Sequence, residues 1–468
     1  MISIHLDYIS SIIIIFFYVI GFLLALYAVF QSRTPQGTMA WILALVGFPF
    51  LSIPAFFFFG KKMIEDYENF EDDLSTTRKK MENEIVDFKI SRDTEFLNKF
   101  MSITDGDFLT GNSLKLLLDG HETYNEMIKA INSAKKYIFL EMYIFRTDRI
   151  GTLFVQALKE RARAGVQVFV LYERLGIKMS KKILSDMKKS GINLGEFTPV
   201  RLNKLQMNFR NHRKLLIVDG KSGFFGGVNI GDDYLGRYPS IGFWRDSNVV
   251  VSGPIVNLAQ VDFIKDWTFS QTNKINLELS VANAQGNSRV LLVNSGPSHE
   301  KPFNLLLHIE FINSAKSRLW VANPYIVPPQ GIIDALMLAQ IKGVDVRILI
   351  PKKSDNWFVA LAMNVYIERL VCAGIRVYRY SPGMMHQKVM LIDDKIGAIG
   401  SSNLDFRSMH INFENTIITD DLEFIKSLDF AIRKDFEQSE EVNKGEFNLL
   451  PFKKKLASHL ANSFAPIL

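Results

Sequence analysis

Apolar residues are unevenly distributed along this chain of 468 residues, and the longest apolar stretches lie near its amino end. Residues 8–30 contain no charged side chain and consist mainly of Ile, Phe, Leu and Val, and residues 38–59 form a second charge-free stretch. A helix of about 20 apolar residues is long enough to cross a bilayer. We therefore predict a transmembrane helical hairpin over residues 1–62, with spans near 8–30 and 38–59. Pro49 and Pro54 leave open a kinked or re-entrant second segment.

Beyond this segment, short apolar runs alternate with stretches whose apolar residues recur at helical spacing. The runs predict strands over 138–144, 166–172 and 215–218, and later over 319–322, 346–350 and 389–392. The intervening stretches predict helices over 151–164 and 331–342. Alternation of strands and helices favours an α/β fold with a largely buried sheet.

The second half of the chain repeats the first. Residues 131–135, Ile-Asn-Ser-Ala-Lys, recur as residues 312–316, and an apolar run follows each copy. Internal repeats of this kind indicate tandem structural units. We therefore predict two α/β halves, over residues 109–271 and 289–445. The remaining segments are a neck or linker over 63–108, a polar linker over 272–288 and an amphipathic tail over 446–468.

One pattern, His-x-Lys-x₄-Asp-x₆-Gly-x₂-Asn, occurs once in each half with identical spacing. The first copy consists of His212, Lys214, Asp219, Gly226 and Asn229. The second copy consists of His386, Lys388, Asp393, Gly400 and Asn403. Two copies with the same spacing are a far more specific signal than one. Together they offer what a two-fold site would need to hold and attack one phosphodiester.

Phosphodiester chemistry requires fixed positive donors at the phosphate oxygens, a nucleophile, and an acid for the leaving oxygen. Lys214 and Lys388 would supply the positive charge, and Asn229 and Asn403 would supply neutral amide donors. One histidine would attack phosphorus to form a covalent phosphohistidine, and the other would protonate the leaving oxygen. A histidine can serve as both acid and base because its pKa lies near neutrality.

Four acidic residues have separate expected roles. A carboxylate on the second ring nitrogen usually fixes the tautomer of a catalytic histidine. We expect Asp246 and Glu414 to orient the histidines in this way. Asp219 and Asp393 belong to the candidate catalytic set by their place in the pattern. Because both end apolar runs and precede turns, we expect them to cap or to form salt bridges rather than react.

Charge and composition restrict the partners. The net charge of +6 favours an anionic partner, and lipid and nucleic acid both fit. The apolar segments favour lipid, and the sequence lacks a basic stretch interleaved with aromatic residues that would suit nucleic acid. The one cysteine, Cys372, excludes an internal disulfide. Since the sequence has no His-x₃-His and no CxxC, we expect neither a metal nor a cofactor.

These residues resemble the phospholipase D superfamily, or HKD family, in which two such motifs form one active site. Residues 211–220, 226–234, 244–246 and 400–408 are similar to bacterial cardiolipin synthases, as is the segment from Arg33 to Gly60. The resemblance covers nearly the whole chain. It implies two tandem phospholipase D-like α/β/α sandwich halves, packed with pseudo-two-fold symmetry behind the membrane hairpin. It also implies that His212 is the nucleophile and that His386 is the acid and base, with no metal.

The resemblance further implies a phosphatidyltransferase acting on phosphatidylglycerol. The enzyme would form phosphatidyl-His212, release glycerol, and make cardiolipin with a second phosphatidylglycerol. The alternatives are a membrane-bound phospholipase D that hydrolyses headgroups, a phosphodiesterase or nuclease, and a scaffold with relic motifs. The expected partners are the lipid substrate and the bilayer, without nucleic acid, and the sequence allows an oligomer. Glu173 stands where relatives often carry aspartate, and its role is open.

Basic residues predict the orientation in the cell membrane. Lys61, Lys62 and the basic residues 78–80 follow the second apolar segment, whereas Arg33 alone lies between the two segments. We therefore predict a multi-pass protein with a cytoplasmic catalytic domain, although the first segment alone weakly favours the opposite orientation.

The carboxyl-terminal tail has an apolar stripe. Its members recur every four residues, at Phe452, Leu456, Leu460 and Phe464, beside Lys453–Lys455. Such a helix would lie either on the membrane surface or against the catalytic domain.

Overall fold

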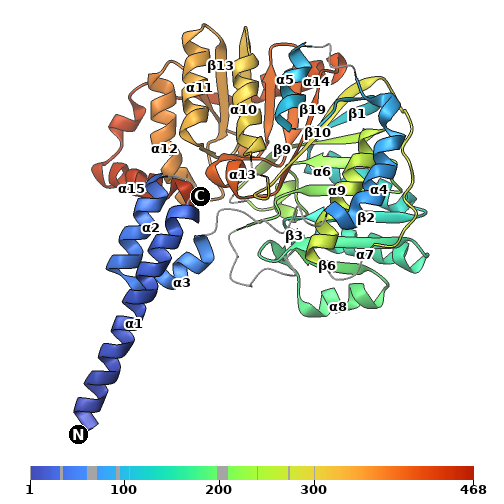
Figure 1. The fold of residues 1–468 in the computed structure, drawn as a ribbon. Coiled ribbons are helices and arrows are strands. Elements are labelled where there is room, and N and C mark those ends of the chain that lie inside the picture. The colour runs from blue at the N-terminus through green and yellow to red at the C-terminus, as the bar shows by residue number, and fades with distance from the viewer. Residues whose placement is uncertain are drawn as a thin grey trace.

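A computed structural model describes residues 2–31, 35–60, 71–90, 95–104, 106–197, 209–239, 241–271, 275–299 and 301–467. Figure 1 shows a long helix, α1 (Ile2–Gln31), that projects from a large α/β body. Within the described residues, α1 alone is long and apolar enough to cross a membrane, with a mean hydropathy of 2.8 over Ile9–Phe30. Only 17% of this stretch is buried, so its apolar side chains face outward, as a lipid environment would require.

The second apolar segment is not one continuous helix, which matches the kink that Pro49 and Pro54 left open. It forms two short helices, α2 (Pro35–Gly47) and α3 (Pro49–Phe59). They separate at Phe48, whose φ of −136° and ψ of 58° are not helical. Proline disfavours a helical conformation in the residue before it and is tolerated in the first turn of a new helix. The three helices share a small core of Ala25, Ala28, Leu45, Ile53 and Phe56.

The first half is a sheet with helices on both faces. Its elements are β1 (Leu109–Asp119), α6 (Gly120–Ser133), β2 (Tyr137–Met142), β3 (Phe145–Arg146), α7 (Arg149–Arg163), β4 (Gln167–Glu173), β5 (Ile177–Lys178), α8 (Lys181–Lys189), β6 (Asn193–Phe197), β7 (Lys214–Val218), β8 (Ser222–Gly226), β9 (Phe243–Ser252) and α9 (Ile255–Ser270). Side chains alternate across β2 because successive residues of a strand face opposite sides. Phe139 stacks on Phe263 of α9, whereas Leu140 packs in a second core with α6 and α7.

The second half repeats this arrangement. Its elements are β10 (Ser288–Ser295), α10 (Phe303–Ser314), β11 (Arg318–Ala322), β12 (Ile326–Val327), α11 (Gln330–Ile341), β13 (Asp345–Pro351), α12 (Trp357–Cys372), β14 (Arg376–Tyr380), β15 (Gly383–Met385), β16 (Val389–Ile392), β17 (Ile396–Gly400), β18 (Leu404–Asp405), α13 (Phe406–His410), β19 (Glu414–Thr419), α14 (Leu422–Glu437) and β20 (Ser439–Glu441). The strands and helices predicted from the apolar pattern in both halves are confirmed, with boundaries that differ by a few residues.

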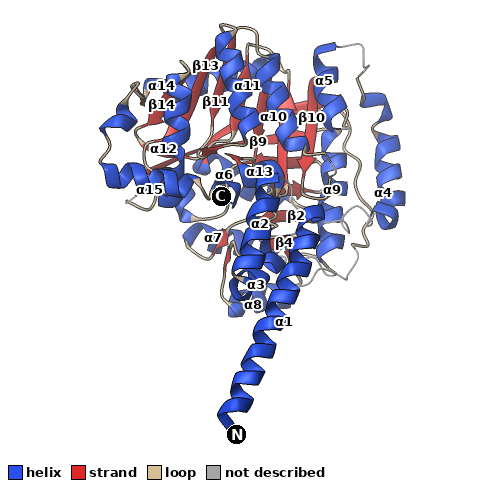
Figure 2. Cartoon of the chain, turned by 60° about the vertical axis from the view of Figure 1, so that its left-hand side comes forward, coloured by secondary structure: helices blue, strands red, loops and turns tan. Residues whose placement is uncertain are grey.

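The two halves form one continuous 16-stranded sheet. Its order is β20-β14-β13-β11-β16-β17-β19-β10-β1-β9-β8-β7-β2-β4-β6, with β15 paired to β9. The halves meet where β1 and β10 pair antiparallel, with Leu109 opposite Val290. Outward from this pair, β9 corresponds to β19, β8 to β17, β7 to β16 and β2 to β11, so the arrangement is pseudo-two-fold. Figure 2 shows helices covering the sheet. The predicted α/β fold with tandem halves is confirmed.

Helices from the expected neck and tail pack onto this body. Met81 of α4 (Glu71–Glu84) enters the core beside α9, and Phe100 of α5 (Glu95–Thr104) lies 5.1 Å from Phe311 of α10, measured between ring centroids. At the carboxyl end, α15 (Phe452–Asn462) lies along α12. Much of the segment assigned to a neck is therefore helical and packed against the catalytic body.

Candidate active site

His212 lies between the two halves of the chain. It precedes β7, and its backbone N–H donates to the carbonyl of Phe413 in the second half at 2.9 Å. Its ring Nδ1 lies 3.0 Å from each carboxylate oxygen of Glu414, the first residue of β19. Because an ionised carboxylate can only accept, Nδ1 carries the proton and Nε2 keeps its lone pair.

His386 is held in the same way by the first half. Its backbone N–H donates to the carbonyl of Arg245 at 2.7 Å, and its Nδ1 lies 2.8 Å from Oδ2 of Asp246. The short strand β15 positions it by pairing in parallel with β9, which places Met385 opposite Arg245. Each histidine is therefore oriented by a carboxylate from the opposite half. This crossed pairing brings the two motifs into one site.

Burial favours neutral imidazoles. It lowers the pKa of His212 to about 4, and the charge of Lys214 adds to this effect, although Glu414 opposes it. Burial, followed by the charge of Lys388, also lowers the pKa of His386. Although burial alone would raise the pKa of Glu414, its interactions with His212 and Lys214 lower it to about 2, so this carboxylate remains ionised.

The two motif lysines are buried beside the histidines. Nζ of Lys214 donates to the carbonyl of His212, and Nζ of Lys388 donates to the carbonyl of His386 at 2.6 Å. Burial lowers the pKa of Lys214 to about 7 and that of Lys388 to about 8, while Glu414 and Asp246 both oppose the shifts. A buried ammonium group is costly unless a negative charge lies near it. The arrangement is therefore suited to an anion such as a phosphodiester.

The motif asparagines have different surroundings. Asn229 accepts a hydrogen bond from the Ile144 N–H at 3.0 Å, and its Nδ2 donates to the hydroxyl of Tyr234. One of its two amide hydrogens is thus used by a protein group, and donation of the other to phosphate stays a prediction. Oδ1 of Asn403 is buried and has no hydrogen-bond partner within the described part of the chain.

Asp219 and Asp393 lie at the opposite ends of β7 and β16 from the histidines. The carboxylate of Asp219 accepts from the backbone N–H groups of Lys135, Lys136 and Tyr137. The carboxylate of Asp393 accepts from those of Lys316, Ser317 and Arg318. Both aspartates have positive φ, 52° and 49°, a conformation that Asp tolerates better than most residues. In this position they hold the starts of β2 and β11.

Comparison with known proteins identifies the family. Residues 127–267 and 308–438, which contain both motifs, match the family model described as cardiolipin synthase, phospholipase D-like domain. Residues 22–61 match the phospholipase D-nuclease amino-terminal family. The chain belongs to the cardiolipin synthase family. With the apolar helix α1, this membership makes it a membrane-associated protein.

Relatives agree over the full length of this cardiolipin synthase family member. Cardiolipin synthase A of Pseudomonas putida strain GB-1 is 34% identical, and the match covers 99% of both chains. Cardiolipin synthase A of Pseudomonas fluorescens strain SBW25 is also 34% identical, with 96% of both chains covered. The crystal structure of phosphatidylserine synthase from Haemophilus influenzae Rd KW20 has a TM-score of 0.61 at 14% identity, covering 80% of this chain and 98% of that one. At this identity the structural match shows the fold alone.

Tyr143 and Tyr325 lie beside the histidines and were not selected from the sequence. The Tyr143 ring lies 4.8 Å from the His212 ring, and Nζ of Lys214 lies 5.3 Å from the Tyr143 ring centroid. The Tyr325 ring lies 6.5 Å from the His386 ring. The two tyrosines end the apolar runs that follow the repeated Ile-Asn-Ser-Ala-Lys segments. The internal repeat therefore carried a signal that pointed to them.

Buried polar groups next to the motif hold its backbone. Glu173, at the end of β4, accepts from the N–H of Asn211 at 2.9 Å, and burial raises its pKa to about 7. Arg213, between the motif histidine and lysine, forms a buried ion pair with Asp266 of α9. These contacts fix the strand entrance that carries His212.

The donor set does not fit a metal ion. Within the described ranges, no three His, Cys, Asp or Glu side chains are grouped to hold one. The two histidines have Lys214 and Lys388 beside them, and their positive charge would oppose a bound cation. The site is therefore suited to catalysis by side chains alone.

Proposed function

We propose that this protein is a cardiolipin synthase that transfers a phosphatidyl group from one phosphatidylglycerol to another and releases glycerol. The observation that carries the proposal is the crossed pairing of His212 with Glu414 and of His386 with Asp246. This pairing gives one site a nucleophile, an acid and two buried cations. Relatives named Cardiolipin synthase A, which match over the full length, support the choice of substrate.

In the first step, Nε2 of His212 attacks phosphorus, and the phosphorus–oxygen bond to the headgroup glycerol breaks. The hydrogen bond from Nδ1 to Glu414 keeps Nε2 unprotonated and stabilises the positive charge that develops on the ring. His386 gives its proton to the departing glycerol oxygen. Lys214 and Lys388 stabilise the negative charge that gathers on the equatorial phosphate oxygens. The products are phosphatidyl-His212 and glycerol.

In the second step, a headgroup hydroxyl of another phosphatidylglycerol attacks the same phosphorus. His386, now neutral, takes the hydroxyl proton as the new phosphorus–oxygen bond forms. The bond between phosphorus and Nε2 breaks, which restores His212 and releases cardiolipin. Two phosphatidylglycerol molecules are thus converted into one cardiolipin and one glycerol.

Substrate charge sets the protonation states that these steps need. Burial and Lys388 favour a neutral His386, yet the first step needs it protonated. A bound phosphodiester brings a negative charge, which favours the charged forms of His386 and of both lysines. Asp246, 2.8 Å from Nδ1, supports the resulting imidazolium. His386 is therefore protonated when the substrate is bound.

Product analysis tests the proposed reaction against hydrolysis. Purified protein in vesicles of phosphatidylglycerol should give cardiolipin and glycerol in equal amounts, and His212→Ala should give neither. Phosphatidic acid as the main product would identify the chain as a phospholipase D instead. Cleavage of nucleic-acid diesters in the absence of lipid turnover would identify a nuclease.

A substrate with a good leaving group tests the roles of the two histidines. Phosphatidyl-p-nitrophenol releases an anion that needs little protonation, so the first step no longer depends on the acid. His386→Ala should release one equivalent of p-nitrophenolate and accumulate phosphatidyl-His212, which peptide mapping would locate. His212→Ala should release none. A phosphorylated residue at position 386 would reverse the assignment.

We also propose that the catalytic domain faces the cytoplasm and that the chain crosses the membrane once. Ring contacts support a re-entrant α2–α3 pair. Phe50, at the start of α3, lies 4.6 Å from Phe17, whereas Phe56, near its end, lies 6.2 Å from Tyr27. Phe56 also lies 5.0 Å from Trp41 of α2. Since α3 follows α1 from Phe17 towards Tyr27, it returns to the side from which α2 entered.

Helix length and charge agree with this topology. At about 1.5 Å per residue, the 13 residues of α2 and the 11 of α3 reach about 20 and 16 Å, short of a hydrocarbon core of about 30 Å. In a re-entrant arrangement α1 and α3 end on the same side, and in the sequence Arg33 comes shortly after α1 and Lys61 and Lys62 come shortly after α3. The two apolar segments then no longer predict opposite orientations. All three basic residues favour the cytoplasmic side for the ends of α1 and α3.

Thiol labelling tests this orientation. Cys372 is exposed on the catalytic domain, so a membrane-impermeant maleimide should label it only after the inner membrane is opened. In a Cys372→Ser background, Ser3→Cys should be labelled in intact cells whose outer membrane alone is permeable. Equal protection of both thiols would support two full spans instead.

A further inference from the structure

The carboxyl-terminal helix α15 leaves its apolar stripe uncovered. It packs on α12 through a face of small side chains, in which Ser458 is 0% exposed and Ala461 is 1% exposed. Nδ2 of Asn364 donates to Oγ of Ser458 at 3.1 Å on this face. The stripe itself points outward, with Phe452 77%, Leu456 49%, Leu460 57% and Phe464 50% exposed. Packing against the catalytic domain therefore does not account for the stripe.

The exposed surface continues beyond α15. Leu449, in the turn before it, is 84% exposed, and Trp357, the first residue of α12, is 72% exposed. The rings of Trp357 and Phe358 lie 5.5 Å apart, and that of Phe358 lies 5.9 Å from that of Phe464. The docking surface is defined here as Trp357, Leu449, Phe452, Leu456, Leu460 and Phe464. Large exposed apolar patches on soluble proteins usually mark an interaction site.

We infer that the docking surface inserts into the interface of an anionic bilayer, beside the membrane helices of the same chain. Three consecutive lysines, Lys453–Lys455, begin α15 and are exposed or half-buried, which is the composition of helices that lie on anionic lipid. Trp357 is of the residue type that favours the headgroup level. A protein partner would need no such basic cluster, so charge favours lipid.

The position of α15 supports the same occupant. Figures 1 and 2 both place the carboxyl end of the chain, with α15 nearby, beside the end of α2 that is nearest the catalytic body. The surface thus lies next to the helices that enter the membrane. Both views also place α13 above that end of α2, and α13 follows Asn403 of the second motif. Docking of α15 would therefore bring the motif side of the molecule against the lipid headgroups.

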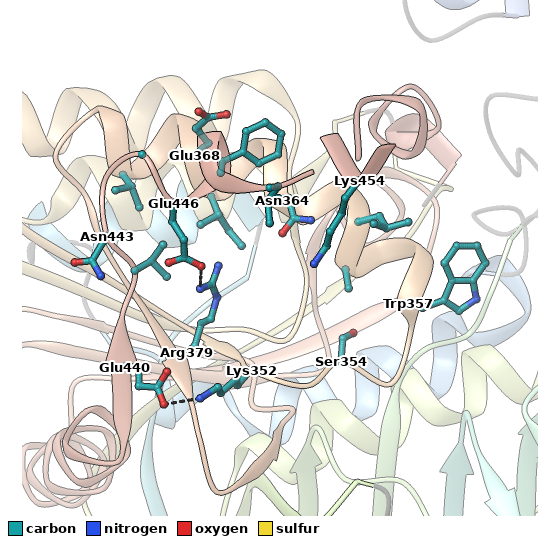
Figure 3. Close-up of a pocket in the computed structure, with 18 residues that line it drawn as sticks. Lys352, Ser354, Trp357, Asn364, Glu368, Arg379, Glu440, Asn443, Glu446 and Lys454 are labelled. Carbon is teal, nitrogen blue, oxygen red and sulfur yellow. Dashed lines mark hydrogen bonds and ion pairs between the residues drawn. The ribbon is translucent and has the colours of Figure 1, made fainter. Parts of the chain in front are cut away.

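The cavity next to the docking surface is lined in part by ion pairs. A cavity of about 620 Å³ lies between α12 and residues 443–450. Figure 3 shows Trp357 and Lys454 on one side of it. On the other side, Arg379 pairs with Glu446, and Lys352 pairs with Glu440. The first pair ties β14 to the turn before α15, and the second ties the residue that follows β13 to β20. They hold the base of the docking surface in place beneath its exposed side chains.

Site-specific fluorescence in nanodiscs tests the inference with the full chain. A polarity-sensitive dye on Leu460→Cys, in a Cys372→Ser background, should shift to shorter wavelength in phosphatidylglycerol nanodiscs and be quenched by nitroxide-labelled lipid. The same dye on native Cys372, at the far end of α12, should instead be quenched by aqueous iodide. Equal iodide access at both positions would overturn the inference. Protection from both quenchers would show that protein covers the surface and would also overturn it.

Activity gives a second readout that does not depend on the dye. Leu456→Ser with Leu460→Ser should lower cardiolipin formation in nanodiscs about fivefold, mainly through KM, and leave the rate in detergent micelles unchanged. Ile341→Ser, 79% exposed at the end of α11, is the matched control and should have no effect. An equal loss in micelles and nanodiscs would indicate damage to the fold and would count against docking. Insertion that is as strong in phosphatidylcholine would refute the role assigned to the lysines.

Discussion

Replacing Glu414 by glutamine tests the crossed pairing directly. The substitution keeps the size of a side chain that is fully buried and leaves an amide oxygen that can still accept from Nδ1 of His212. It removes the negative charge that stabilises the imidazole ring as that ring becomes positive during attack on phosphorus. The expected defect is therefore in the chemical step, since substrate contacts are unchanged.

The size of the defect follows from the distance. At 3.0 Å and an effective dielectric constant of about 20, opposite unit charges attract by about 5 kcal/mol. Because the ring gains only part of a charge in the transition state, we expect to lose about 4 kcal/mol, or about 10³-fold in kcat. Glu414 also raises the pKa of Lys214, which burial lowers to about 7. Its loss should lower that pKa further and move the residual activity to lower pH.

The assay is cardiolipin formation from phosphatidylglycerol in nanodiscs, measured from pH 5 to 9, with Tm as the control for folding. Ser401→Ala is the matched control, because Oγ of Ser401 donates to Glu414 and its removal leaves the charge in place. We expect that variant to lose less than about tenfold, as for one hydrogen bond to a charged group. A Glu414→Gln enzyme with normal Tm, more than a third of the wild-type rate and an unshifted pH profile would refute the orienting role.

Other variants and conditions test the remaining assignments. The pH profile of kcat/KM should be bell-shaped: activity should fall below about pH 4 as His212 gains a proton, and it should fall as the pH rises, first as His386 loses its proton and then, above about pH 7 to 8, as the lysines lose theirs. A profile that is flat between pH 5 and 9 would contradict this. His386→Ala should lose at least about 10³-fold in cardiolipin formation while remaining folded and membrane-bound, and near-normal turnover would exclude the paired-histidine mechanism. Asp219→Ala removes the acceptor of three backbone hydrogen bonds worth about 1 kcal/mol each, so Tm should fall by several degrees while the folded enzyme keeps its activity at 25 °C. Treatment with EDTA should leave the rate unchanged, and a loss restored by a divalent cation would show that metal takes part.

Much of the fold was predictable because each strand and helix follows from a local apolar pattern, and because this pattern occurs twice in the chain. The nearly continuous burial of β2 and of its counterpart β11 follows from the apolar runs alone. The position of His212 and His386 at strand entrances follows from the same runs. The second apolar segment shows the limit of such reasoning. Composition could not distinguish one span from two half-length helices, because the break at Phe48 depends on the backbone before Pro49 and on packing against α1.

The sequence by itself determined the duplicated motif, the α/β halves and the residue types that the chemistry uses. It also indicated that Asp246 and Glu414 act on histidines, but not which one each would contact. Only the tertiary structure decided that pairing, because it depends on β15 joining β9 and on Phe413 binding the backbone of His212. Both contacts join residues more than a hundred positions apart. Contacts over such separations are set by how the two halves pack together, which no local pattern encodes.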